Sequence, residues 1–212
     1  MPQLGLFPLP IVLVPTEHVP LHIFEPRYRE LIEECLDTGD EFGFVLATGD
    51  GAVHEIGTRA AVQQVLETLE DGTMNIVVEG GDRFRLLELT HGRSFNTGVV
   101  EEMTDDDDPA APDDITRALE LFFELAEIAG GEVDVPDPDT EQLDFELAAR
   151  VDFGVDAKQE LLASTSPRRR MARLVELLDV ALEAVRLEQT LRERAGQNGK
   201  VAPLEPDADP DS

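Results

Sequence analysis

Residues 61–79 have the sequence AVQQVLETLEDGTMNIVVE, and they contain two runs typical of β-strands, Ala61–Thr68 and Thr73–Glu79. Between the runs lies Glu70-Asp71-Gly72, in which Gly72 can adopt the positive φ that tight turns need. The stretch therefore predicts an antiparallel β-hairpin, and we expect the chain around it to be rich in strands.

Further strand candidates lie on both sides of this hairpin. Ile11–Val14 and Phe42–Ala47 are short apolar runs upstream of it. Downstream, Gly80-Gly81 is expected to break the chain before a strand at Arg83–Leu89, and Thr97–Met103 is expected to be the last strand. Such close spacing with turn residues between strands favours an antiparallel barrel or sandwich over βαβ units.

One helix is expected within this β-rich half, from Pro26 to Gly39. Proline suits the first helical position and glycine suits the C-terminal stop. Tyr28, Leu31, Ile32 and Cys35 repeat at helical spacing, so they predict one buried face. Cys35 is therefore interpreted as an inert core thiol.

After Asp105–Asp108 the pattern becomes helical. Four helices are expected, over residues 113–130, 140–153, 156 onward and 166–195. Asp113 or Asp114 could cap the first of these, and Asp156 with Gln159 resembles a capping box for the third. The fourth carries an apolar seam, formed by Met171, Leu174, Leu178, Ala181 and Val185. We expect an α+β fold with a β subdomain (1–104), a helical subdomain (105–195) and a disordered acidic tail (196–212).

Charge and composition exclude several classes of protein. The 212 residues carry a net charge of −29, with acidic runs at 101–114, 131–146 and 201–212, which argues against nucleic-acid binding. A single cysteine excludes an intrachain disulfide and an all-cysteine zinc site. The apolar stretch Leu4–Pro15 is interrupted by prolines and lacks a basic start, so it predicts neither a signal peptide nor a membrane span. A soluble, cytoplasmic protein is expected.

Two segments near the N-terminus, Leu6–Pro10 and Val19–Tyr28, resemble the opening signature of the Lon protease N-terminal domain. That signature contains Leu-Phe-Pro-Leu, then Pro-Leu, then Ile-Phe-Glu-Pro-Arg-Tyr. Shorter matches follow in order at residues 57–60, 71–72, 75–78, 80–84 and 158–162. The resemblance spans about residues 4–195, and it implies a PUA-like antiparallel pseudo-β-barrel followed by an α-helical bundle with a long last helix.

The chain lacks the motifs of the other Lon modules. It contains no phosphate loop of the form G-x-x-x-x-G-K-[ST], and its two lysines, Lys158 and Lys200, do not suggest a Ser-Lys dyad. It is therefore similar to stand-alone Lon-domain proteins. The resemblance implies a non-catalytic module without cofactor or metal that binds polypeptide clients or a protease or ATPase partner. The alternatives are an ATP-dependent peptidase and a PUA-like RNA-binding module.

The candidate partner-binding residues come from the signature loops. They are Phe7, Phe24, Tyr28, Arg83 and Phe84. For the four aromatic residues, packing in the core or at a strand edge is the favoured interpretation. For Arg83, hydrogen bonds to buried carbonyls across the barrel are favoured over contact with a bound peptide.

The dense basic cluster is a second candidate site. It consists of Arg168, Arg169, Arg170 and Arg173, at a helix N-terminus where the macrodipole disfavours cations. An acidic internal loop, Asp105–Asp108 or Glu132–Asp144, is the favoured compensation, and an acidic partner protein is the alternative. Asp105–Asp108 is otherwise interpreted as a solvated linker.

Two further hypotheses concern metal binding and self-association. His18, His22 and Glu25 could suggest metal ligands, but Pro20 separates the histidines and no further ligand is evident, so we expect no metal. The second half of the last helix could expose a seam for dimerisation, formed by Leu182, Val185 and Leu191. Because this half is also rich in charge, we expect a monomer or a weak dimer.

Overall fold

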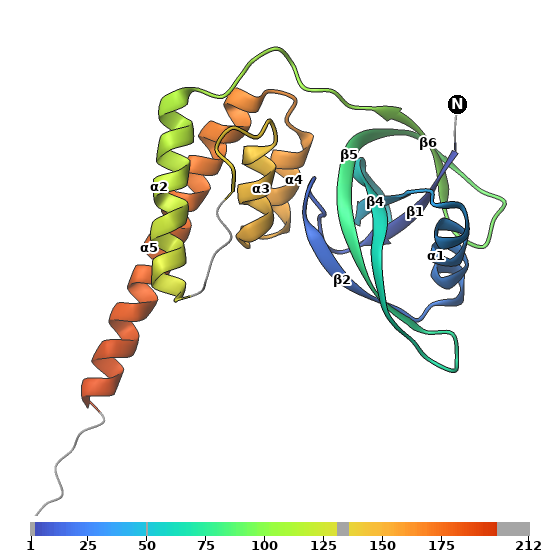
Figure 1. Ribbon diagram of the computed structural model, residues 1–212, viewed down its shortest axis with the longest axis horizontal. Coiled ribbons are helices and arrows are strands. Elements are labelled where there is room, and N and C mark those ends of the chain that lie inside the picture. Colours follow the sequence, from blue (N-terminus) through green and yellow to red (C-terminus); the bar gives the residue numbers. More distant parts are fainter. Residues whose placement is uncertain (1–2, 50, 131–135, 199–212) are drawn as a thin grey trace, which may run out of the picture.

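The computed structural model describes residues 3–49, 51–130 and 136–198 and has a mixed α+β architecture (Figure 1). The strands of its six-stranded sheet are β1 (Gln3–Leu9), β2 (His18–Ile23), β3 (Phe42–Ala47), β4 (Val53–Thr68), β5 (Met74–Thr90) and β6 (Thr97–Glu102). The helices over these residues are α1 (Pro26–Thr38), α2 (Pro112–Ala129), α3 (Leu143–Arg150), α4 (Val155–Ala163) and α5 (Pro167–Asn198).

The strands are hydrogen-bonded in the order β2-β5-β4-β3-β1-β6, and β6 also pairs with β5. The hairpin predicted from the sequence is confirmed, because β4 and β5 pair antiparallel over most of their length. One pair departs from the predicted antiparallel sheet: β1 and β3 run parallel, since α1 lies between β2 and β3 and returns the chain to the same end.

The predicted break at Gly80-Gly81 is wrong, because β5 continues through both glycines. Gly80 allows the segment before β2 to cross the strand closely: its N–H donates to the Glu17 carbonyl at 2.9 Å, and its own carbonyl accepts from the Thr16 N–H at 2.7 Å. A Cβ at position 80 would lie 2.2 Å from the Val14 carbonyl oxygen. The glycines thus admit a crossing segment without ending the strand.

The predicted strand at Ile11–Val14 is also wrong. Val12, Leu13 and Val14 are buried, but the segment is irregular. The flanking residues form β1 and β2 instead, although each contains a proline: Pro8 lies opposite Val45, and Pro20 lies opposite Val77. Proline is tolerated at the end of a strand or in an edge strand, and β2 lies at the end of the strand order.

Helix α1 has the bounds and the buried face that the sequence predicts. Tyr28, Leu31, Ile32 and Cys35 are buried, and Gly39 ends the helix in the left-handed conformation with φ 74°. These side chains pack against one face of the sheet in a core that also contains Phe7 and Phe42.

In the helical half, α2 lies alongside α5, and α3 and α4 lie between these two helices and the sheet (Figure 1). The seam of α5 is confirmed at Met171, Leu174 and Leu178, which are buried together with Leu182. The predicted exposed seam is therefore wrong at Leu182, whereas Leu191 is 55% exposed. Of the predicted tail, residues 196–198 belong to α5, and 199–212 lie outside the described residues.

Two predicted helix caps are wrong. Ala111 occupies the N-cap of α2 without a side-chain hydrogen bond, and Pro112 opens the helix, so Asp113 and Asp114 lie in the first turn. Gly154 is the N-cap of α4, and Gln159 reaches across to the sheet, where its amide donates to the Ile56 carbonyl at 3.1 Å. No helix in the described part of the chain is long and apolar enough to cross a membrane.

Candidate functional site

Two buried arginines, Arg83 and Arg170, meet Asp105 and Asp144 between the sheet and the helices. We call these four residues the arginine clasp. Arg83 donates to the carbonyls of Leu162 at 2.9 Å and Ser164 at 2.6 Å and is ion-paired with Asp105. Arg170 donates to Asp144 at 2.6 Å and to Asp105 at 2.7 Å. The clasp thus joins β5, the segment after β6, α3, the end of α4 and α5.

Burial and charge act in opposite directions on the acids of the clasp. Burial alone would raise the pKa of Asp105, but hydrogen bonds and charges from Arg170 and Arg83 outweigh it and lower that pKa below its usual range. For Asp144, which is 5% exposed, burial dominates and raises the pKa, although Arg170 and the Phe145 N–H stabilise the carboxylate. Asp105 is therefore the more firmly ionised partner of the two arginines.

The basic cluster at the start of α5 is compensated within the chain, as the favoured interpretation predicts. Arg168 contacts Asp108 at 2.8 Å and Arg170 contacts Asp105, while Arg173 pairs with Glu160 at 3.0 Å. Arg169 is exposed. Asp105–Asp108 is thus a solvent-exposed linker between β6 and α2 that is also held to the helices by ion pairs from Asp105 and Asp108.

The five candidate residues from the signature loops lie in different environments. Phe7, Tyr28 and Phe84 are buried in the core, and Arg83 belongs to the clasp, where the carbonyls it binds are those of the helical half. Phe24 is 62% exposed and does not belong to the core; it follows the edge strand β2 and stacks on His22. Among these five residues, Phe24 alone presents a large surface to solvent.

Phe24 stacks on His22 beside a hollow that lies across strands β2, β5 and β4. The hollow has a volume of about 570 Å³ and is lined by Pro20, Leu21, His22, Leu66, Glu67, Asn75 and Ile76. The Phe24 ring stacks on His22 with centroids 5.9 Å apart, and His22 Nδ1 lies 2.7 Å from Asn75 Oδ1. We call these eight residues the β2 groove.

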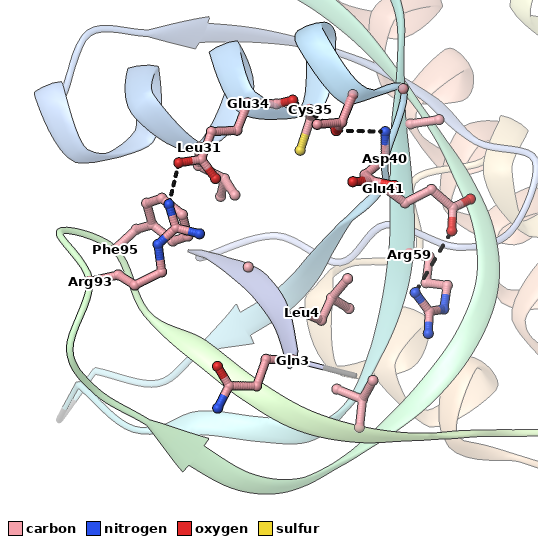
Figure 2. A pocket seen from close by; sticks show the side chains of 15 residues that line it. Gln3, Leu4, Leu31, Glu34, Cys35, Asp40, Glu41, Arg59, Arg93 and Phe95 are labelled. Carbon is pink, nitrogen blue, oxygen red and sulfur yellow. Dashed lines mark hydrogen bonds and ion pairs between the residues drawn. The ribbon is translucent and has the colours of Figure 1, made fainter. Parts of the chain in front are cut away.

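A second hollow lies between α1 and the sheet and has a volume of about 830 Å³ (Figure 2). Leu4, Leu31, Cys35, Phe95 and Val100 give it an apolar lining. Two arginines lie at its sides: Arg93 pairs with Glu34 and stacks on Phe95 at 4.3 Å, while Arg59 faces Glu41 at 3.9 Å. We call this hollow the α1 cavity.

The histidines considered as metal ligands have other partners. His22 contacts Asn75, Glu25 pairs with Arg27 at 2.8 Å, and His18 lies 4.0 Å from Glu79. Over the described residues, no group of three or more His, Cys, Asp or Glu side chains could hold a metal ion. The β2 groove and the α1 cavity present apolar surface with a few polar and charged groups beside it. Such a lining suits the binding of a ligand through apolar contacts.

Neither hollow is predicted as a site by the sequence. The β2 groove combines four residues of the signature segment Val19–Tyr28 with residues of the predicted hairpin, and only the fold shows that Phe24 and Leu66 are exposed there (62% and 53%). The α1 cavity draws on four segments, residues 3–5, 31–41, 59–61 and 93–100, which only the fold brings together.

Comparisons with known proteins give one consistent result. A family model described as "ATP-dependent protease La (LON) substrate-binding domain" matches residues 3–180. The Lon protease of Rhizobium meliloti (strain 1021) is 25% identical over 201 residues, which cover 87% of this chain and 25% of that protein. The Lon protease of Brucella suis biovar 1 (strain 1330) is 24% identical over 203 residues, covering 87% of this chain and 24% of that protein.

Solved structures agree with the family model. The crystal structure of a Lon N-terminal domain protein from Xanthomonas campestris has a TM-score of 0.67 and 27% identity, and the match covers 83% of this chain and 98% of that one. The N-terminal domain of the Mycobacterium avium complex Lon protease shares the fold, with a TM-score of 0.63 at 16% identity over 84% of this chain and 98% of that one. The chain spans about a quarter of the length of the Lon proteases that it matches, and it belongs to the family of Lon substrate-binding domains.

Proposed function

We propose that this chain is a non-catalytic polypeptide-binding module that recognises substrates or acts as an adaptor in Lon-type proteolysis. The observation that carries the proposal is the β2 groove, where apolar side chains remain exposed beside an edge strand. Phe24 and Leu66 are 62% and 53% exposed. Exposed apolar groups gathered in a hollow indicate an interaction surface.

The position of β2 supports binding of an extended segment. Strand β2 pairs with β5 on one side and ends the strand order, so its other edge has no strand neighbour among the described residues. A client segment could add to this edge through backbone hydrogen bonds and place an apolar side chain on Phe24. Pro20 lacks an N–H, which limits this pairing to part of the strand.

The rest of the molecule acts as the scaffold in this proposal. We propose that residues 1–104 form a PUA-like pseudo-barrel and that residues 105–195 form a helical bundle attached through the arginine clasp. The module would act in the cytoplasm as a monomer or weak dimer, without binding nucleic acid. The net charge of −29 supports the last point.

Binding of an unfolded polypeptide by a Phe24→Ser variant tests this function. Reduced, alkylated α-lactalbumin carrying a fluorophore serves as the probe in an anisotropy titration. We expect the substitution to weaken binding about tenfold or more, as removal of an aromatic hot spot does. The matched control is Phe123→Ser, since Phe123 is a partly exposed phenylalanine (39%) on α2, far from the groove in the fold.

Equal binding by wild type and Phe24→Ser would contradict the β2 groove as the binding surface. The purified chain is also expected neither to hydrolyse ATP nor to cleave casein, and either activity would contradict its assignment as non-catalytic.

A further inference from the structure

Arg59 lines the α1 cavity as a partly buried arginine with one distant acidic partner. Its side chain is 19% exposed, yet its nearest acidic atom, Glu41 Oε2, lies 3.9 Å away. Among the described residues its guanidinium makes no hydrogen bond, whereas the equally partnered Arg85 (3.8 Å from Glu55) is 46% exposed and reaches water freely. A guanidinium has five N–H donors, and those of Arg59 make no hydrogen bond to another described residue. Arg59 can therefore donate to an anionic group in the cavity.

The cavity also borders a part of β1 that has a strand neighbour on one side only. Residues Gln3–Gly5 of β1 pair with β6 on one side, but the register with β3 begins only at Leu6. At residues 3–5 the other edge of β1 therefore has no strand neighbour among the described residues, and these same residues line the cavity. An extended backbone could lie along this edge.

The lining of the α1 cavity combines arginines with apolar side chains. Figure 2 shows Arg59 and Arg93 on opposite sides, with Leu4 and Leu31 between them. Arg93 is already engaged by Glu34 and Phe95, so Arg59 is the arginine available to a ligand. The volume of about 830 Å³ lies within the range of small-molecule sites and accommodates a large apolar side chain.

We propose that the α1 cavity binds the C-terminal residue of a polypeptide. The terminal carboxylate lies against Arg59, the apolar side chain packs on Leu4 and Leu31, and the preceding backbone runs beside Gln3–Gly5. This inference rests on the proposed polypeptide-binding function and names the end of the chain as a recognised feature. Asp40 and Glu41 also line the cavity, and Glu41 lies 3.9 Å from Arg59, so the terminal carboxylate competes with Glu41 for this guanidinium.

The backbone edge favours a polypeptide over other apolar acids. A fatty acid supplies the carboxylate and the apolar body, but it has no N–H and C=O groups to pair with β1. An internal peptide segment supplies the backbone but no carboxylate. A chain end provides all three groups.

Anisotropy titrations with two labelled decapeptides test the proposal. Both peptides end in leucine and lack acidic side chains, one with a free carboxylate and the other with a C-terminal amide. We expect the amide to bind about tenfold more weakly, because it loses a charge-assisted contact with Arg59. In the Arg59→Gln variant the two peptides should bind alike, while the Arg85→Gln control should keep the tenfold preference.

The Arg59→Lys variant and decanoate complete the design. Arg59→Lys keeps the positive charge and should retain part of the preference for the acid peptide. Circular dichroism shows whether Arg59→Gln is folded. If it is not, the comparison between wild type and Arg59→Lys tests the proposal. Equal binding of acid and amide peptides to the wild type would overturn the proposal. Decanoate binding as tightly as the acid peptide, with loss in Arg59→Gln, would overturn the assignment to a polypeptide end.

The outcome separates this inference from the proposed function. If acid and amide peptides bind alike while α-lactalbumin still binds in a Phe24-dependent manner, the C-terminal site is wrong and the β2 groove stands. If neither peptides nor α-lactalbumin bind, both proposals fail.

Discussion

At the scale of single residues, charged side chains are buried in the arginine clasp, where the sheet meets the helices. Arg170 is 1% exposed and is satisfied by Asp144, Asp105 and the Ser164 carbonyl, while its guanidinium lies over the Phe145 ring at 4.2 Å. A buried ion pair of this kind adds little net stability over an apolar pair. Removing one partner, however, leaves the other as an uncompensated buried charge.

Replacing Arg170 by alanine should therefore lower the free energy of unfolding by about 3–5 kcal/mol. Urea denaturation followed by circular dichroism measures this change. Arg192→Ala is the control, because Arg192 is 76% exposed and pairs only with Glu188 among the described residues, so its loss should cost at most about 0.5 kcal/mol. Equal midpoints for both variants would contradict the burial of the clasp.

Cys35 gives a second prediction at this scale. Burial, followed by the charges of Asp40 and Glu34, raises the pKa of its thiol to about 11. At pH 8 the thiolate fraction should be about a hundred-fold lower than for an ordinary cysteine, and access is restricted as well. We expect the folded protein to react with Ellman's reagent far more slowly than the protein in 6 M guanidinium chloride; complete labelling within the mixing time would contradict this.

At the scale of elements, β5 is the strand on which the sheet depends, because it pairs with β2, β4 and β6. It remains continuous through Gly80-Gly81, where the segment before β2 crosses it. The two glycines are not equivalent in this respect. Position 80 faces backbone, while the nearest atom to a Cβ at position 81 is the mobile carboxylate of Glu41, at 3.3 Å.

Gly80→Ala should accordingly destabilise the protein by about 1–3 kcal/mol or more, because the new methyl group would displace the Val14 carbonyl. Gly81→Ala is the matched neighbour and should be neutral or slightly stabilising, since alanine restricts the unfolded chain. Thermal unfolding of the two variants measures the difference. Similar losses in both would show that the glycines are needed for strand geometry in general.

The elements predicted correctly from the sequence are those with a strong local signal. The β4–β5 hairpin has a turn between two β-branched runs, and α1 has both a proline start and a glycine stop. Strands β1 and β2 were missed because Pro8 and Pro20 indicate breaks locally, whereas the sheet places them where a missing N–H is tolerated.

The candidate site was less predictable than the fold. Phe24 could be identified from its signature segment, but its exposure depends on where β2 meets the hairpin. Phe7, Tyr28 and Phe84 belong to the same signature segments and are buried. Arg59 had no distinguishing pattern around it, because its shortage of partners arises only from the packing of α1 against the sheet.

At the scale of the whole molecule, the arginine clasp attaches the helical half to the sheet. Because Asp105 has a lowered pKa in the folded state, its carboxylate contributes stability that is fully present above its ordinary pKa of about 4. That contribution is lost as the pH falls through the lower folded value. The stability that Asp105 contributes to the attachment of the two halves is therefore expected to decrease at low pH.

We expect Asp105→Asn to cost about 1–3 kcal/mol at pH 7, since Arg83 and Arg170 lose a charged acceptor. The gap in urea midpoint between wild type and variant should shrink steadily below about pH 4 and close at lower pH. Asp113→Asn serves as the control, because Asp113 is an exposed acid in the first turn of α2. A gap that stays constant with pH would contradict the role of the ionised carboxylate.

The hydrogen bonds of Arg83 to Leu162 and Ser164 span 79 and 81 residues of sequence. A ribosome adding about 5–20 residues per second needs about 4–16 s to deliver those carbonyls after it has added Arg83. During that interval the rest of β5 is synthesised, but the Arg83 guanidinium has no acceptors from the helices and stays in water. The nascent sheet therefore cannot reach its final packing until α4 has emerged, which ties completion of the N-terminal half to synthesis of the C-terminal half.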